Sequence, residues 1–171
     1  MTLAQAPRIP ELLGLELTIA RLAGNMRNFG FGAIRPAPKG GTIGDFALHI
    51  QCPWRIEGPD GIYTGGEDLY VYAGGEQQPE NWSYEAGNSL QTARLDSLLG
   101  PRIGSKRAYY YASGIKVVET DFDEVNGDLF IAFSSGHQLR VFPQSAETEQ
   151  WRLLRPSDES PHLVFGDRGE N

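Results

Sequence analysis

The residues best suited to chemistry are three arginines and a histidine that stand near aromatic side chains in segments of alternating pattern. They are Arg27, Arg55, Arg152 and His162, and two of the arginines directly follow Trp54 and Trp151. Alternation along a strand sends a tryptophan and the next arginine to opposite faces, so the indole enters a core while the guanidinium faces outward. A guanidinium placed there either pairs with a protein carboxylate or binds the carboxylate or phosphate of a ligand.

Two interpretations of these residues follow. In the first, each guanidinium forms a structural ion pair, because charged side chains are rarely buried without a partner. In the second, the arginines and His162 converge on a small anionic ligand, in a pocket walled by Trp54 and Trp151. The ion pairs are the favoured interpretation, and the pocket is the alternative.

The single cysteine and the three histidines would support other chemistry only if the fold brought them together. Cys52 needs a nearby base to become a nucleophile, but His49 is three residues away in a strand-like run and so lies on the opposite face. A metal site would need His49, His137 and His162 to converge. We expect Cys52 to be a core residue and the histidines to make local hydrogen bonds, so no catalytic residue, metal site or cofactor is predicted.

A short cluster of basic and aromatic residues follows Gly100-Pro101. Arg102, Lys106 and Arg107 precede three consecutive tyrosines, a mixture found in proteins that bind single-stranded nucleic acid. The chain as a whole has a formal net charge of −7, which opposes binding to a polyanion. We therefore expect a surface loop here, and nucleic acid is disfavoured as a partner.

Length and composition predict one domain with its own core, spanning residues 1–171. A chain of 171 residues buries roughly 70% of the surface that its unfolded form exposes, without help from metal or disulfide. A single cysteine excludes an internal disulfide and indicates a cytoplasmic protein. We expect no secretory signal and no membrane association. Residues 1–10 are predicted to form an N-terminal arm and residues 166–171 a flexible tail.

The clearest structural signal is a meander of three antiparallel strands in residues 115–143. Its first strand is predicted over residues 115–125 and ends at Asn126-Gly127, a dipeptide typical of type I′ hairpin turns. Ser135-Gly136 marks the second turn. One face of this meander is apolar throughout, so it needs another layer to pack against.

The rest of the chain carries short strand patterns and one helical pattern. Strands are predicted within residues 13–34 with a turn at Gly24-Asn25, 45–56 with an interruption at Pro53, 69–72, 149–154 and 162–165. A helix is predicted over residues 88–99, with Asn88 as its N-cap and Gly100-Pro101 as its stop. We therefore expect a mainly β fold, an antiparallel barrel or bent sandwich with one short helix, or else a two-layer α+β arrangement.

Several motifs carry a resemblance to a known family. They are ALHIQCPWRI at residues 47–56, GxLxxxFxxGxxLxVFP at 127–143, ExWRL at 149–153, HLV at 162–164, and Arg27 with two Phe-Gly pairs downstream. Together they resemble an uncharacterised family of small bacterial proteins. The resemblance implies a bacterial, cytoplasmic protein and carries no reaction, cofactor or catalytic residue. More loosely, the chain is similar to small acidic immunity partners of bacterial toxins.

Strands and turns give the strongest signals, and nothing in the sequence amounts to a catalytic signature. We therefore expect a non-enzymatic module that binds another protein, because the acidic balance suits electrostatic attraction to a basic partner. Immunity to a toxin is one specific version. The alternative is a small-molecule-binding β barrel, or a hydrolase built in one, with an arginine-lined pocket for an anionic ligand.

Overall fold

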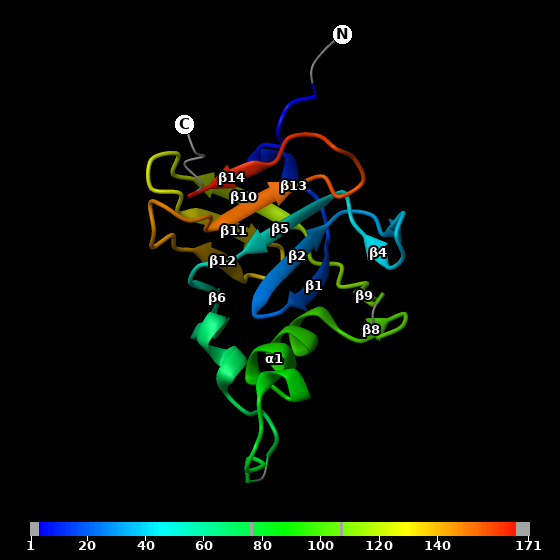
Figure 1. Ribbon diagram of the computed structural model, residues 1–171, viewed down its shortest axis with the longest axis vertical. Helices are drawn as coiled ribbons and strands as arrows, with labels where there is room; N and C mark the ends of the chain where they lie inside the picture. Colours follow the sequence, from blue (N-terminus) through cyan, green and yellow to red (C-terminus); the bar gives the residue numbers. More distant parts are fainter. Residues whose placement is uncertain (1–3, 76, 107, 167–171) are drawn as a thin grey trace.

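The computed structural model describes residues 4–75, 77–106 and 108–166, and its two largest elements are five-stranded antiparallel sheets (Figure 1). The first has the order β1-β2-β5-β13-β14, with strands Leu17–Ala23, Met26–Phe31, Phe46–Ile50, Trp151–Leu154 and Leu163–Phe165. The second has the order β10-β11-β12-β6-β7, with strands Val117–Phe122, Leu129–Phe133, Gln138–Val141, Trp54–Gly58 and Gly61–Gly65. Two short hairpins are formed by β3 and β4 (Arg35–Pro36, Thr42–Ile43) and by β8 and β9 (Arg102–Ile103, Tyr110–Tyr111).

The sheets form a bent sandwich and not a closed barrel, so the predicted mainly β fold is confirmed in its sandwich form. Main-chain hydrogen bonds join the two sheets at one corner, where the amide of Leu17 donates to Ile115 (2.8 Å) and that of Val117 to Leu15 (2.9 Å). The chain also crosses between the sheets from β5 to β6. Pro53 lies at this crossing, where its missing N–H ends the ladder of the first sheet.

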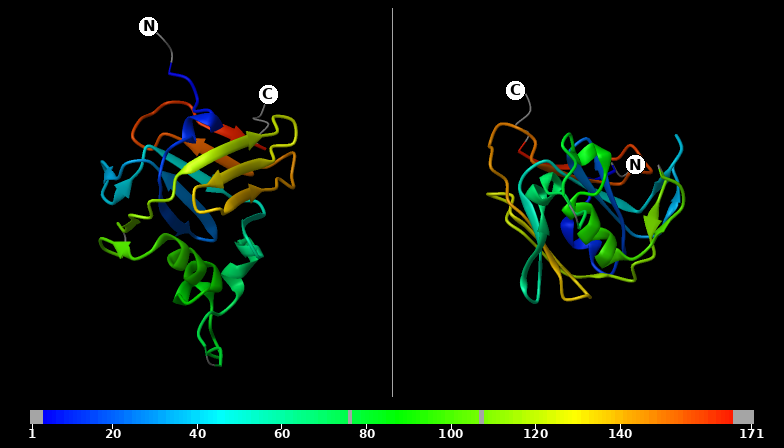
Figure 2. Two further views of the ribbon diagram at one scale, coloured as in Figure 1. Left: turned by 180° about the vertical axis from the view of Figure 1, so that it is seen from behind. Right: turned by 90° about the horizontal axis from the view of Figure 1, so that it is seen from below.

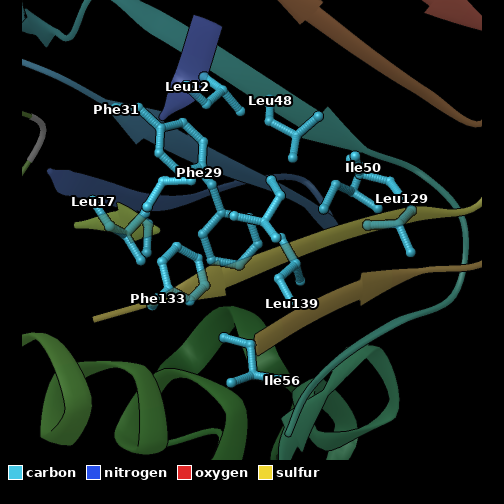
Figure 3. Packing of buried hydrophobic residues seen from close by; sticks show 14 of the residues in the cluster. Leu12, Leu17, Phe29, Phe31, Leu48, Ile50, Ile56, Leu129, Phe133 and Leu139 are labelled. Atoms are coloured by element: carbon cyan, nitrogen blue, oxygen red, sulfur yellow. The ribbon is translucent and has the colours of Figure 1, made fainter. Parts of the chain in front are cut away.

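Alternate residues of the facing strands fill the space between the sheets (Figure 3). Leu129, Ile131 and Phe133 of β11 are buried there, as the sequence pattern predicted. On β2, Phe29 points into this core and Gly30 points outward, where a Cβ atom would come within 2.6 Å of the Ile19 Cβ. Glycine is therefore required at position 30 because a neighbouring side chain passes directly over it.

One α-helix, α1 (Leu90–Leu99), covers an open end of the sandwich (Figure 2). The predicted helix is confirmed, but its N-cap is Ser89 and not Asn88: the Ser89 hydroxyl accepts from the amide of Thr92 at 3.2 Å. Leu95 and Leu99 turn into the core. Three short 3-10 helices also occur, η1 (Ile9–Leu12), η2 (Gly66–Tyr70) and η3 (Tyr84–Ala86), and they complete the helical elements of the described residues.

Two local predictions are wrong. The turn after β10 is not type I′, since Gly127 has a positive φ (79°) but Asn126 does not. Instead the Asp123 carboxylate accepts from the amides of Val125 (2.8 Å) and Asn126 (3.0 Å), which makes a wider loop and ends β10 at Phe122. The strand predicted at residues 69–72 is also absent, because Leu69 and Tyr70 belong to η2 and Tyr72 forms only an isolated antiparallel bridge with Ser89.

The ends of the chain were predicted to be an arm and a tail. Ile9 in the expected arm belongs to η1 and is buried against the core. Residues 1–3 of the arm and 167–171 of the tail lie outside the described residues. Within residues 4–75, 77–106 and 108–166, no helix has both the length and the apolar composition that crossing a membrane requires.

Candidate functional site

Trp54 and Trp151 occupy equivalent positions, since each is the first residue of a strand that follows a crossing between the sheets. Trp151 is fully buried and its indole N–H donates to the Gly127 carbonyl at 2.9 Å. The Trp54 ring is 7% exposed and meets the edge of Phe29 at a centroid distance of 5.4 Å. Both indoles therefore enter the core, as alternation predicted.

Arg55 lies on the outer face of the second sheet in a charged network. Its guanidinium is 2.8 Å from the Glu57 carboxylate, and Arg140 on the neighbouring strand reaches the other oxygen of the same carboxylate, also at 2.8 Å. Gln138 donates to Glu57 at 2.7 Å. The hydrogen bond from Arg140 is the main reason that the pKa of Glu57 is lowered. Arg55 thus has the structural ion pair that the sequence favoured.

Arg152 lies on the outer face of the first sheet, opposite His49 in the strand register. It forms an ion pair with Glu149 and donates to His162 Nδ1 at 3.1 Å. Because arginine can only donate, His162 is the acceptor in this contact. Burial, and then the charge of Arg152, lower the pKa of His49, so this imidazole is held neutral.

The structure does not bring the six predicted residues together. Arg55 and Arg152 face outward from opposite sheets, and the two tryptophan rings lie in the core between them. The predicted convergence on one pocket is therefore wrong, while ligand binding by any single one of these residues stays a prediction. Cys52 is not an activated thiol either, because burial raises its pKa to about 12.

Arg27 differs from the other two arginines in having only neutral partners. It is 2% exposed and lies beneath the first turn of α1. Its Nε donates to Gln91 Oε1 at 2.9 Å, and Nη2 donates to the same oxygen. Nη2 also donates to the Thr92 hydroxyl at 3.4 Å, and Nη1 donates to the Ala20 carbonyl at 3.3 Å. No carboxylate of the described residues lies within 4.0 Å of this guanidinium. Burial lowers the pKa of Arg27 to about 10, so the charge persists at neutral pH.

A hollow of about 680 Å³ borders Arg27 and opens to solvent. Its lining comes from β1, β2, the start of α1, the segment before α1, and the residues around β8 and β9. Arg102 forms part of the wall, where it pairs with Asp96 (2.9 Å) and stacks on the Tyr109 ring at 4.2 Å. Lys106 adds a second cation to the wall, and Glu85 adds a carboxylate.

A second feature projects from the same end of the molecule. Residues 71–75 and 77–89, which we call the finger, extend beyond α1 and away from the sandwich (Figure 1). Main-chain hydrogen bonds close its stem, from Ala73 to Asn88 and from Leu90 to Val71, both at 2.7 Å. Edge-to-face ring pairs support it, Tyr72 with Trp82 at 5.4 Å, and Tyr84 with Tyr70 of η2 at 5.7 Å.

The finger belongs to a long stretch of the chain that has acidic residues and no basic ones. Between Arg55 and Arg94 the sequence has no lysine or arginine and seven acidic residues: Glu57, Asp60, Glu67, Asp68, Glu76, Glu80 and Glu85. At the base of the finger, Tyr70 is 52% exposed and Val71 is 44% exposed. Solvent therefore meets aromatic and apolar surface beside carboxylates, with no basic side chain from this segment to neutralise them.

Neither the finger nor the contact between Gln91 and Arg27 was predicted from the sequence. The finger appears in the sequence as an aperiodic loop, although its lack of basic residues is readable there. Gln91 also had a signal, because it lies four residues before Leu95 and eight before Leu99 on the buried side of α1. A polar side chain in such a position needs a buried partner, and here that partner is Arg27.

Comparison with protein-family models, with curated proteins and with solved structures finds no match to this chain. The resemblance to a family of small bacterial proteins accordingly stays a prediction, and the arguments for function rest on the finger and on Arg27.

Proposed function

We propose that the protein is a non-enzymatic binding protein of the cytoplasm that recognises a basic region of another protein through the finger. The observation that carries the proposal is a projecting acidic segment whose fold is secured by its own stem hydrogen bonds and ring pairs. A segment that is already ordered loses little conformational entropy on binding, which favours its use as a recognition surface.

The composition of the finger supports contact with protein. Tyrosine and tryptophan supply large contact areas at a low entropic cost, while serine, glycine and asparagine supply adaptable hydrogen bonds, and the finger is rich in both groups. Its carboxylates would attract a basic surface during the encounter and oppose the approach of an acidic one. The net charge of −7 acts in the same direction over longer distances.

Immunity to a bacterial toxin is one specific form of this function. It is supported only by a loose similarity to small acidic immunity proteins, and the fold alone does not distinguish an immunity protein from another binding module. The identity of the captured partner decides between them.

Affinity capture from the native bacterium at low salt tests the proposal when it compares two variants of equal charge change. Glu67→Lys/Glu80→Lys alters the finger and its base, and Glu119→Lys/Glu124→Lys alters exposed residues of the β10–β11 hairpin at the other end of the molecule (Figure 2). We expect a basic protein to be retained by the wild type and by the hairpin variant and lost by the finger variant. Equal retention or equal loss in both variants would refute a role for the finger.

A further inference from the structure

We propose that the hollow beside Arg27 is a binding site for a small oxyanion, the carboxylate or phosphate group of a small organic molecule. The proposed anion is a ligand distinct from the protein partner of the finger, although Tyr84, Glu85, Gly87 and Asn88 of the finger form part of the lining of the hollow. Arg27, which is buried, and Lys106 both belong to its lining.

The first reason is the unbalanced charge of Arg27. Its guanidinium is almost completely removed from water, and its four hydrogen bonds all go to uncharged oxygens. A buried charge without a counter-charge is unfavourable, and neutral acceptors reduce this cost only in part. Nη1 carries two hydrogens and has one protein acceptor among the described residues, so one N–H remains for another acceptor. An anion bound in the hollow would supply both the charge and the acceptor.

The second reason is the position of α1. Thr92 lies in the first turn of this helix, and its hydroxyl contacts Arg27 on one side while the residue lines the hollow on the other. The N-terminus of a helix carries a partial positive charge, so it adds to the unfavourable potential around an unpaired cation. The same potential favours an anion. The helix N-terminus and Arg27 therefore repel each other, and both would attract an anion bound in the hollow.

The wall of the hollow shows which charges remain available. Arg102 is already neutralised by Asp96, whereas Arg27 and Lys106 have no carboxylate within ion-pair distance in the described part of the chain. Glu85 is the opposing charge in the wall. Two available cations against one carboxylate leave a net positive charge, which suits a single oxyanion group. At about 680 Å³ the hollow has room for the rest of a small metabolite.

Isothermal titration calorimetry with inorganic phosphate and with acetate tests the site, and chloride at equal ionic strength controls for salt. We expect saturable binding of at least one of the two anions by the wild type. Lys106→Gln should weaken it severalfold. The matched control Lys116→Gln removes an exposed lysine that directly precedes β10 and does not line the hollow, so it should leave anion binding unchanged. Phosphate binding without acetate binding would assign a phosphate ligand, and the reverse a carboxylate ligand.

Arg27→Met should weaken binding by roughly tenfold or more, because it removes the buried cation. If this variant does not fold, Thr92→Val replaces it and should weaken binding while keeping α1. Absence of saturable binding to both anions overturns the proposal, as does equal weakening by Lys106→Gln and Lys116→Gln. Since none of these residues belongs to the finger, the result does not depend on whether the finger binds a protein.

Discussion

Arg27 and Arg55 show two different ways in which the protein accommodates a guanidinium group. Arg55 stands on an outer sheet face, half in solvent, and shares the Glu57 carboxylate with Arg140. Arg27 is buried under α1 and is held by an amide, a carbonyl and a hydroxyl. The half-exposed Arg55, whose charge water already stabilises, has a carboxylate beside it, whereas the buried Arg27 has none although burial makes its charge costly. Burial and pairing, and not the residue type, therefore indicate at which arginine a bound anion would stabilise the folded protein most.

The largest effect should come from the acceptor that holds Arg27. Gln91→Leu removes the oxygen that accepts from both Nε and Nη2, and it leaves a buried cation with fewer partners. We expect the free energy of unfolding to fall by about 3 kcal/mol. Urea denaturation measures this change. The double variant Arg27→Met/Gln91→Leu should recover most of the loss, and a double variant as unstable as Gln91→Leu alone would contradict the comparison.

Substitution of Arg27 itself should depend on whether the charge is kept. Arg27→Lys preserves the cation but loses the planar fork that reaches Gln91 and Ala20 together, so we expect a loss of about 2 kcal/mol. Arg27→Met removes the cation and should lose only about 1 kcal/mol, because an apolar side chain of similar length needs no counter-charge. Thermal denaturation ranks the two variants. A methionine variant less stable than the lysine variant would show that the charge itself is stabilising.

Arg55→Ala should have a smaller effect. Glu57 keeps Arg140 and Gln138 when Arg55 is removed, and the Arg55 side chain is 41% exposed. Exposed ion pairs contribute less than about 1 kcal/mol, and added salt weakens them further. Urea denaturation of Arg55→Ala and Arg140→Ala at low and high salt checks this. A loss above that of Gln91→Leu would reverse the comparison between the two regions.

The smallest effect should be the contribution of Glu57 to the pH dependence of stability. The pKa of Glu57 is lowered from 4.5 in the folded state, chiefly by the hydrogen bond from Arg140, so the folded protein binds this proton less readily than the unfolded chain. The carboxylate therefore contributes stability above pH 4.5, and this contribution is lost as the pH falls below that value. Thermal denaturation from pH 6 to pH 3 should show a shallower decline for Glu57→Gln. The acceptors of Arg27 do not titrate in this range, so Gln91→Leu should keep the wild-type slope.

Local sequence patterns determined most of the secondary structure. Asn and Gly at turns, alternation in residues 129–133 and the apolar stripe before Gly100 each act within a few residues, and the structure confirms the hairpin at Gly24-Asn25, strand β11 and helix α1. Alternation also placed both tryptophans in the core. The turn after β10 was mispredicted because Asp123 competes for the same amides through its side chain.

Only the tertiary structure decided which of the arginines is buried. The sequence treated Arg27, Arg55 and Arg152 alike, since each stands in a strand-like run near aromatic residues. The ion pairs of Arg55 and Arg152 are local, with Glu57 two residues away and Glu149 three residues away, whereas Arg27 meets Gln91, which lies 64 residues further along the chain. The burial of Arg27 depends on this long-range contact, and no local pattern specifies it. The sequence therefore determined that the arginines lie in strands, and the packing of α1 on the end of the sandwich determined that one of them is buried without a carboxylate.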